Sequence, residues 1–219
     1  MIALSAEQGL ALAFCGARYR QAFSLLLQFD RSLGRAVQQQ GPPVAGQLRL
    51  AWWREQIADL HIDRGANLVL TELARLLTAE DSARQDLSRM IDGWEVLLVN
   101  DDLSDENLLQ YAKERGGGLF CLAAKVAGSG EDTGETEAGI VWALVDLARH
   151  CSDPVLANRV VGLARAYIGS ARQLSRHLRP FALLAYFAER DVVRGSERLL
   201  PAGSPRRIVQ AWRFSLGLG

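Results

Sequence analysis

Several features that would place a chain in a common class of protein are missing from this sequence. No apolar run approaches the roughly 20 residues of a transmembrane helix. The formal net charge is zero, because 25 basic side chains balance 25 acidic ones across the 219 residues. Nucleic acid usually binds a clearly basic face, so this balance gives no sign of a nucleic-acid partner.

The N-terminal residues lack the basic segment with which a secretory signal peptide begins. Only three cysteines are present, Cys15, Cys121 and Cys151, and they form neither a C-x-x-C pair nor a disulfide framework. We interpret them as small buried apolar side chains. The sequence predicts a cytoplasmic protein and leaves peripheral attachment to a membrane open.

Strand-like alternation is also missing, and nearly every segment has a helical period instead. Ser5 and Gln8 have the S-x-x-Q spacing of a capping box, which opens a short first helix. Further helices are predicted over 17–39, from the Pro42-Pro43 break to near residue 64, and over 67–77, 80–99, 104–127, 135–150, 153–174, 177–194 and 204–215. The chain has no internal repeat, so residues 1–219 are predicted to form one all-α domain.

The stretch LRLAWWREQI places two tryptophans side by side on the third predicted helix. Neighbours on a helix project about 100° apart, so the two rings belong to different faces. Trp53 shares an apolar face with Leu50 and Ile57, whereas Trp52 shares a mixed face with Arg49. This mixed face is either solvated or turned toward a polar pocket between helices, and the pattern favours neither interpretation.

Asp30 lies inside the apolar stripe of the second predicted helix. A buried carboxylate is costly unless it has a partner, so the sequence predicts a basic or hydrogen-bond-donating side chain beside it. The helix that carries the two tryptophans offers candidates for that partner.

The runs RYRQAFSLLLQFDRSLGRAV, VAGQLRLAWWREQI and MIDGWEVLLVNDDLSDENLLQYAKERGGGLFCLAAKVAG resemble the squalene and phytoene synthase family, and GIVWALVDLARHCSD follows in the same order. The likeness is greatest to a divergent branch of that family related to mitochondrial complex I assembly factors. The resemblance implies an all-α, isoprenoid synthase-like helical bundle with a central cavity. The residues expected to border that cavity are Asp30, Arg31, Arg49, Trp52, Trp53, Tyr111, Asp146 and Arg149.

Active members of the family hold Mg²⁺ against prenyl diphosphates with two facing aspartate-rich helices, since Mg²⁺ prefers oxygen ligands. This chain departs from both motifs. Gly34 and Arg35 stand at the first pair of aspartate positions, and His150 replaces an aspartate after the matching Arg149. An arginine in place of a ligand opposes the metal directly, so we expect no metal site and no cofactor.

Two other aspartate strings have metal-like spacing. Asp101-Asp102-Leu-Ser-Asp105 precedes the predicted helix cap at Ser104, where its carboxylates would cap the helix and complement its dipole. Asp59 and Asp63 lie near the predicted end of the third helix. Short motifs of this kind arise by chance, and we interpret both strings as structural.

The C-terminal third is rich in arginine, from Arg165 through Arg172, Arg176, Arg179, Arg190 and Arg194 to Arg206 and Arg207. We interpret these arginines as solvated helix faces. The alternative is a surface that meets anionic lipid headgroups or an acidic partner. Trp212, Phe214 and Leu216 beside Arg213 are typical of an interfacial anchor.

Three functions are consistent with these patterns. The leading hypothesis is a catalytically degenerate family member that binds an isoprenoid or lipid, or a protein partner at a membrane during respiratory complex assembly; the assembly role follows from the resemblance alone. The second is an active, Mg²⁺-dependent head-to-head prenyltransferase with substitute carboxylates such as Asp30, Asp146 and Asp153. The third is a structural helical module with a filled core. The oligomeric state is not predicted.

Overall fold

The computed structural model of the chain describes residues 3–39, 42–58, 68–77, 81–100, 103–129 and 134–218. These residues form helices and turns and no strand, which confirms the all-α fold. None of the helices in these ranges is both long enough and apolar enough to cross a bilayer.

The α-helices are α1 (Ala6–Ala13), α2 (Ala17–Gln38), α3 (Pro43–Ala58), α4 (Leu68–Leu77), α5 (Asp81–Val99), α6 (Asp105–Ala112), α7 (Gly118–Ala127), α8 (Gly134–His150), α9 (Pro154–Ala164), α10 (Arg179–Arg194) and α11 (Pro205–Ser215). A π-helical turn, η1 (Lys113–Gly117), joins α6 to α7. Short 3₁₀ turns follow α9 and α10.

Residues suited to helix capping stand at several helix ends. Ser5 accepts from the backbone of Gln8, whose side chain returns to the Ser5 backbone, so the capping box at α1 is confirmed. Asp153 caps α9, in which Pro154 occupies the first turn. Gly128 caps the C-terminal end of α7, and its φ of 67° is the left-handed conformation that favours glycine.

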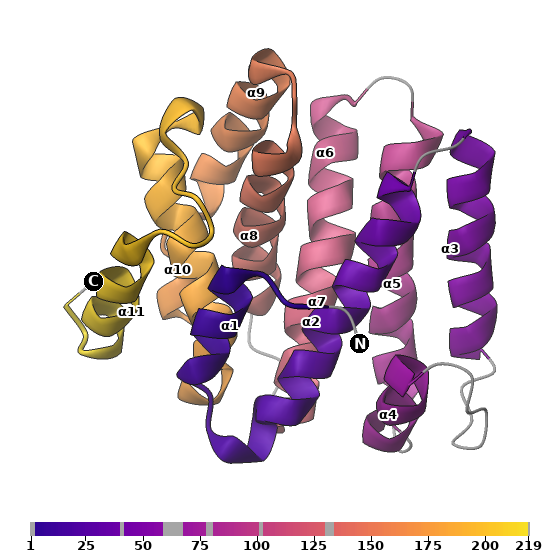
Figure 1. Cartoon of the computed structure of the whole chain (residues 1–219), viewed down its shortest axis with the longest axis horizontal. Helices are drawn as coiled ribbons and strands as arrows, with labels where there is room; N and C mark the ends of the chain where they lie inside the picture. The colour runs from indigo at the N-terminus through magenta and orange to yellow at the C-terminus, as the bar shows by residue number, and fades with distance from the viewer. Residues whose placement is uncertain are drawn as a thin grey trace.

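The long helices stand side by side, with α3 at one edge of the molecule and α10 and α11 at the other (Figure 1). α8 lies in the middle and packs against η1, α9 and α10. Val141, Ala143 and Leu144 of α8 are fully buried, and one continuous hydrophobic core extends from α1 to α11. Because α8 is buried on most sides, polar side chains on it need partners inside the protein.

The predicted helix over 153–174 is wrong in its second half. α9 ends at Ala164, and two 3₁₀ turns follow, separated at Gly169 by a φ of 103° that no α-helix contains. Glu189 of α10 fixes this segment, because its Oε1 accepts from the backbone N–H groups of Gly169 and Ala171 at 3.0 and 2.9 Å. A distant carboxylate has therefore taken the place of helical hydrogen bonds.

The predicted helix over 104–127 is continuous but contains the π turn. Gly116 of this turn crosses α8 at Gly139: a Cβ atom on Gly116 would lie 2.0 Å from the Gly139 carbonyl oxygen, and one on Gly139 would lie 2.2 Å from that of Gly116. Only glycine permits so close a backbone approach. The Gly116-Gly117-Gly118 run is thus a packing feature, and it brings η1 against the centre of α8.

Candidate functional site

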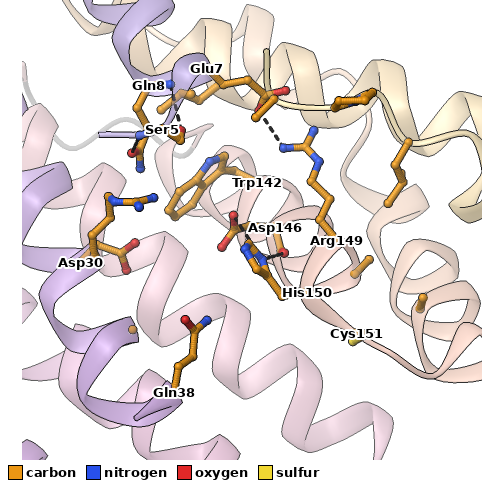
Figure 2. Close-up of a pocket in the computed structure, with 18 of the residues that line it drawn as sticks. Ser5, Glu7, Gln8, Asp30, Gln38, Trp142, Asp146, Arg149, His150 and Cys151 are labelled. Carbon is orange, nitrogen blue, oxygen red and sulfur yellow. Dashed lines mark hydrogen bonds and ion pairs between the residues drawn. The ribbon is translucent and has the colours of Figure 1, made fainter. Parts of the chain in front are cut away.

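A pocket of about 660 Å³ opens beside α2 and α8. Figure 2 shows Asp30 on one wall and Asp146 on the other, with Trp142 nearby and Ser5, Glu7 and Gln8 at the N-terminal end of the chain. The lining is completed by Arg115 of η1, by Cys151 and Ser152, and by residues of segment 196–202, α5, α9 and α10. The α2 and α8 residues that line the pocket are Asp30, Arg31, Gly34, Arg35, Gln38, Trp142, Asp146, Ala148, Arg149 and His150.

The partner of Asp30 is Arg115 of the π turn, not a residue of α3. Arg115 donates from Nε and Nη2 to the two Asp30 oxygens at 2.8 Å each. Its Nη2 is also 2.8 Å from Oδ2 of Asp146. Trp94 of α5 adds a hydrogen bond from Nε1 to Asp30 at 3.0 Å. One guanidinium therefore joins the two carboxylates that face the pocket.

Aromatic rings surround this guanidinium. The Arg115 Cζ atom lies 4.1 Å from the ring centre of Trp94 and 4.7 Å from that of Trp142. Its Nη1 also donates to the Tyr111 hydroxyl, one turn back along the same helix. Close contact with ring faces together with bidentate hydrogen bonding is a combination that arginine satisfies and lysine does not.

The charges of this cluster depend on one another. Burial alone would lower the pKa of Arg115, whose side chain is 3% exposed, but Asp30, Tyr111 and Asp146 together outweigh burial and hold that pKa well above its ordinary value. Burial similarly favours a raised pKa for Asp146, but Arg115 together with His150 and Arg149 outweighs burial and lowers that pKa. Burial raises the pKa of the Tyr111 hydroxyl. At neutral pH the cluster holds an arginine cation, an Asp146 carboxylate and a neutral phenol.

Gly34 and Arg35 stand where the resemblance places metal-binding aspartates. A Cβ atom on Gly34 would lie 3.0 Å from two atoms of the Trp94 ring, so the indole occupies the space that a side chain at residue 34 would need. Arg35 is exposed and lines the pocket together with Arg31, one helical turn before it. The Nε atom of Arg31 is buried without a hydrogen-bond partner among the described residues.

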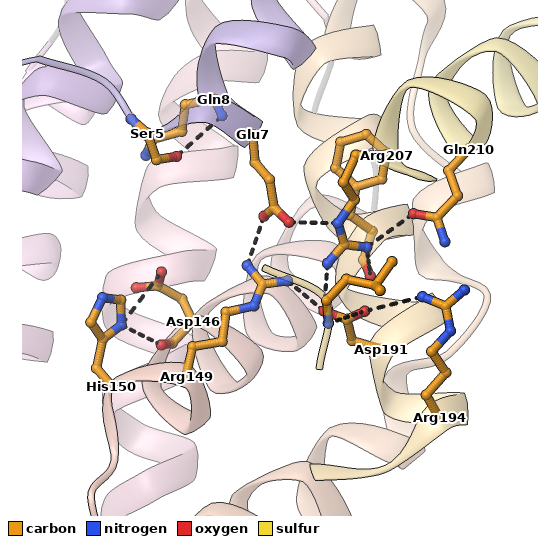
Figure 3. A network of polar contacts seen from close by, with 12 residues as sticks. Ser5, Glu7, Gln8, Asp146, Arg149, His150, Asp191, Arg194, Arg207 and Gln210 are labelled. Carbon is orange, nitrogen blue, oxygen red and sulfur yellow. Dashed lines mark hydrogen bonds and ion pairs between the residues drawn. The ribbon is translucent and has the colours of Figure 1, made fainter. Parts of the chain in front are cut away.

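A second cluster of charges lies next to the pocket (Figure 3). Arg149 contacts Glu7 at 2.7 Å and Asp191 at 2.5 Å, and Arg207 contacts the same two carboxylates at 2.6 and 2.5 Å. The four side chains form a closed ring of alternating charge that joins α1, α8, α10 and α11. Burial tends to lower the pKa of Arg149, but the carboxylates of Glu7 and Asp191 raise it above its usual value.

These residues do not fit the Mg²⁺ site that the resemblance implies. Asp30 and Asp146 share one arginine, and Glu7 and Asp191 share two, so each carboxylate is already paired with a guanidinium. Among the described residues, no three His, Cys, Asp or Glu side chains are grouped as they would be to hold a metal ion. Asp153, a proposed substitute ligand, instead caps α9. Asp59, Asp63, Asp101 and Asp102 lie outside the described residues.

The structure divides the predicted pocket residues into three groups. Asp30, Arg31, Asp146 and Arg149 line the pocket, and Tyr111 is fully buried behind Arg115. The remaining three, Arg49, Trp52 and Trp53, line a separate groove of about 400 Å³ between α2 and α3.

On α3, the two tryptophans differ as their faces predict. Trp53 is 8% exposed and packs edge-on against Phe29, whereas Trp52 is 43% exposed. Arg49 donates from Nε to the Ala36 carbonyl at 2.8 Å, near the C-terminal end of α2, where a cation is favoured. It therefore stabilises a helix end and not the Asp30 carboxylate.

Sequence reasoning missed the residues that decide the character of the pocket, above all Arg115 and Trp94. Arg115 lies four residues after Tyr111 within the LLQYAKERGGG run, and this spacing puts both on one helix face. The π turn then alters the direction of Arg115, and no pattern in the sequence indicates such a turn. Asp191 and Arg207 were missed because their partners are 42 and 200 residues away, at Arg149 and Glu7.

The family comparison agrees with this fold. The model of the squalene/phytoene synthase family matches residues 5–154, which is 150 of the 219 residues and covers α1 to the start of α9. The chain belongs to the squalene/phytoene synthase family, and its all-α architecture is the isoprenoid synthase-like fold of that family. No curated protein and no solved structure matches the chain. The likeness to complex I assembly factors stays a prediction.

Proposed function

We propose that this protein has lost metal-dependent prenyl transfer and binds an isoprenoid or other lipid with an anionic head, without converting it. The observation that carries the proposal is the placement of Arg115 between Asp30 and Asp146, at 2.8 Å from each. In the family such carboxylates would be needed to hold Mg²⁺ against the diphosphate. A guanidinium there repels the metal and engages the carboxylate oxygens that would bind it.

The pocket contains groups suited to both the anionic head and the apolar chain of such a ligand. Arg31 and Arg35 line it from adjacent turns of α2, and neither forms an ion pair among the described residues. Arginine binds phosphate through paired hydrogen bonds without a bridging cation. Trp142, Leu184 and Leu199 supply apolar lining. A volume of about 660 Å³ is within the range of pockets that bury a small ligand.

Direct binding and product analysis test this proposal. Purified protein is incubated with farnesyl or geranylgeranyl diphosphate, with Mg²⁺ and with a chelator, and both bound lipid and released pyrophosphate are measured. We expect saturable binding that the chelator leaves unchanged, and no release of pyrophosphate. Mg²⁺-dependent release would instead establish the active prenyltransferase and overturn the proposal.

The role of the α2 arginines is tested by Arg31→Gln with Arg35→Gln. We expect roughly a tenfold or greater loss of affinity for the diphosphate, because hydrogen bonds to charged groups contribute about 1.5–3 kcal/mol each. Arg18→Gln, also on α2 but outside the pocket, is the matched control. Equal affinity in both variants would place the ligand elsewhere. Unchanged affinity for the prenyl alcohol would assign the arginines to the anionic head.

A further inference from the structure

The outward face of α11 is apolar. Ile208, Val209, Trp212 and Leu216 are 50%, 60%, 58% and 66% exposed. At about 100° per residue these four side chains fall within one arc of about 100° around the helix. Leu218 follows at 62% exposed, so this stripe holds five of the twelve exposed large apolar side chains in the described part of the chain. Concentration of this kind marks an interaction surface, whereas single exposed apolar residues do not.

The inner face of α11 is anchored, which fixes the direction of the stripe. Arg207 is fully buried in the charge ring, and Ala211 is fully buried in the core. Phe214 packs against Tyr186 of α10 with ring centres 4.8 Å apart, so it is not part of the exposed stripe. The predictions of a solvated Arg207 and of Phe214 as part of an anchor are therefore corrected. Rotation of α11 to bury its stripe would break the ring.

Arginines border the stripe on one side. Arg206 and Arg213 of α11 face Arg190 and Arg194 of α10 across a groove of about 270 Å³. Tyr186, Val209 and Gln210 complete the lining, so no acidic residue lines this groove among those that the structure describes. Asp191, which is 3.7 Å from Arg194, is fully buried and already bound to Arg149 and Arg207. The groove is thus strongly cationic on a chain of zero net charge.

We propose that the α10–α11 surface, defined as the apolar stripe of α11 together with the four arginines of the groove, binds an anionic lipid membrane. An apolar stripe bordered by arginine is the arrangement with which an amphipathic helix enters the boundary between headgroups and acyl chains. The arginines pair with headgroup phosphates, and the stripe is withdrawn from water. A second copy of the chain is a poorer occupant, because a two-fold contact through this face would bring the arginine groove close to its own copy.

Vesicle co-sedimentation tests the proposal without reference to the central pocket. The full chain is mixed with vesicles of phosphatidylcholine alone and with vesicles of equal parts phosphatidylcholine and phosphatidylglycerol. We expect binding to the mixed vesicles that weakens with added salt, and little binding to the neutral ones. Equal binding to both, or binding to neither, would overturn it.

Exposed residues permit variants that leave the fold unchanged. Val209→Ser with Leu216→Ser removes apolar surface from the stripe, and Val44→Ser with Leu48→Ser, on α3, is the control because those two side chains are 60% and 67% exposed. We expect the α11 pair to abolish most vesicle binding and the α3 pair to leave it unchanged. Equal losses would mean that any exposed apolar surface suffices, against the proposal.

A single charge change separates phosphate pairing from apolar insertion. Arg206→Gln should weaken binding to the mixed vesicles about fivefold, since a basic residue near an anionic surface contributes on the order of 1 kcal/mol. Arg18→Gln should have no such effect. If sedimentation equilibrium instead shows a dimer that Leu216→Ser dissociates, and vesicle binding is absent, the face is an interface between copies and the membrane proposal is wrong.

Discussion

The cation of Arg115 is enclosed by two carboxylates, an indole hydrogen-bond donor to one of them, and three aromatic rings. Removing one partner of a buried ion pair leaves the other charge without compensation, which costs about 3–5 kcal/mol. Arg115→Met should therefore lower the free energy of unfolding by about that amount, measured by urea denaturation. The exposed Arg54, paired with Asp92 and Glu95 on the surface, is the control, and Arg54→Met should cost no more than about 1 kcal/mol.

Neutralising the carboxylates as well separates lost charge from lost packing. With Asp30→Asn and Asp146→Asn added to Arg115→Met, no buried charge remains unpaired, and much of the lost stability should return. A triple variant no more stable than Arg115→Met alone would show that the arginine acts through packing against Trp94 and Trp142.

Glu189 is a buried carboxylate that accepts hydrogen bonds from backbone N–H groups, unlike Asp30 and Asp146, which pair with an arginine. Burial raises its pKa above the ordinary value, and the N–H groups of Gly169 and Ala171 offset this only in part. A raised carboxyl pKa means that the folded state holds its proton to higher pH, so stability falls as pH rises from the unfolded value through the folded one. Glu189→Gln can still accept these hydrogen bonds, and thermal unfolding at pH 7 should show it more stable than the parent. The stabilising effect should vanish well below pH 4, where the Glu189 carboxyl is protonated in both the folded and the unfolded state. A variant less stable than the parent at pH 7 would contradict this account.

At the level of the helices, the crossing of η1 and α8 depends on two glycines. A methyl group on Gly116 would lie 2.0 Å from the Gly139 carbonyl oxygen, and both partners are backbone, which cannot move aside easily. Gly116→Ala should cost about 3 kcal/mol or more in urea denaturation, at the upper end of the overpacking range. Gly162→Ala, at an exposed position of α9 with no atom within 4 Å, should instead stabilise by about 0.4–1 kcal/mol. Equal effects of the two substitutions would mean that the crossing is not as close as described.

The sequence predicted the ends of most helices better than the irregular turns within or after them. Periodicity and caps placed the start of α1 and both ends of α2, α5, α8, α10 and α11 within a residue or two of their bounds. They could not indicate the π turn at 113–117, because one π turn shifts the helical phase only slightly, and so short a segment is too brief for periodicity to reveal the shift. Nor could they indicate that α9 stops at Ala164, since the carboxylate that holds the following turns comes from Glu189, on another helix.

For the molecule as a whole, the family resemblance predicted the fold, and individual residues showed where this chain departs from the family's metal-binding motifs. The loss of aspartate at residues 34 and 35 can be read from the sequence, but the Trp94 ring at that place cannot. A basic or hydrogen-bond-donating partner for Asp30 was predicted from its apolar surroundings, whereas the identity of that partner required the folded structure, because Arg115 is 85 residues away. The charge ring likewise joins Glu7, Arg149, Asp191 and Arg207 across nearly the whole chain, and two of its members lie beyond the matched range of residues 5–154.

The two proposals concern different regions of the same protein. Arg31 and Arg35 line a pocket of about 660 Å³, whereas the α10–α11 surface faces the solvent. The ring links the two regions physically, because Arg149 lines the pocket while Arg207 anchors α11. Either proposal can fail alone, since lipid diphosphate binding and vesicle binding are separate measurements on separate residues.

The guanidinium of Arg115 differs from a metal ion in how it is supplied. A bound ion exchanges with the surrounding solution, so its occupancy follows the concentration of that ion and of its competitors. Arg115 is attached to the chain and is present once in every copy from the moment of synthesis. The positive charge between Asp30 and Asp146 is therefore part of the polypeptide, and it does not depend on the concentration of any ion in solution.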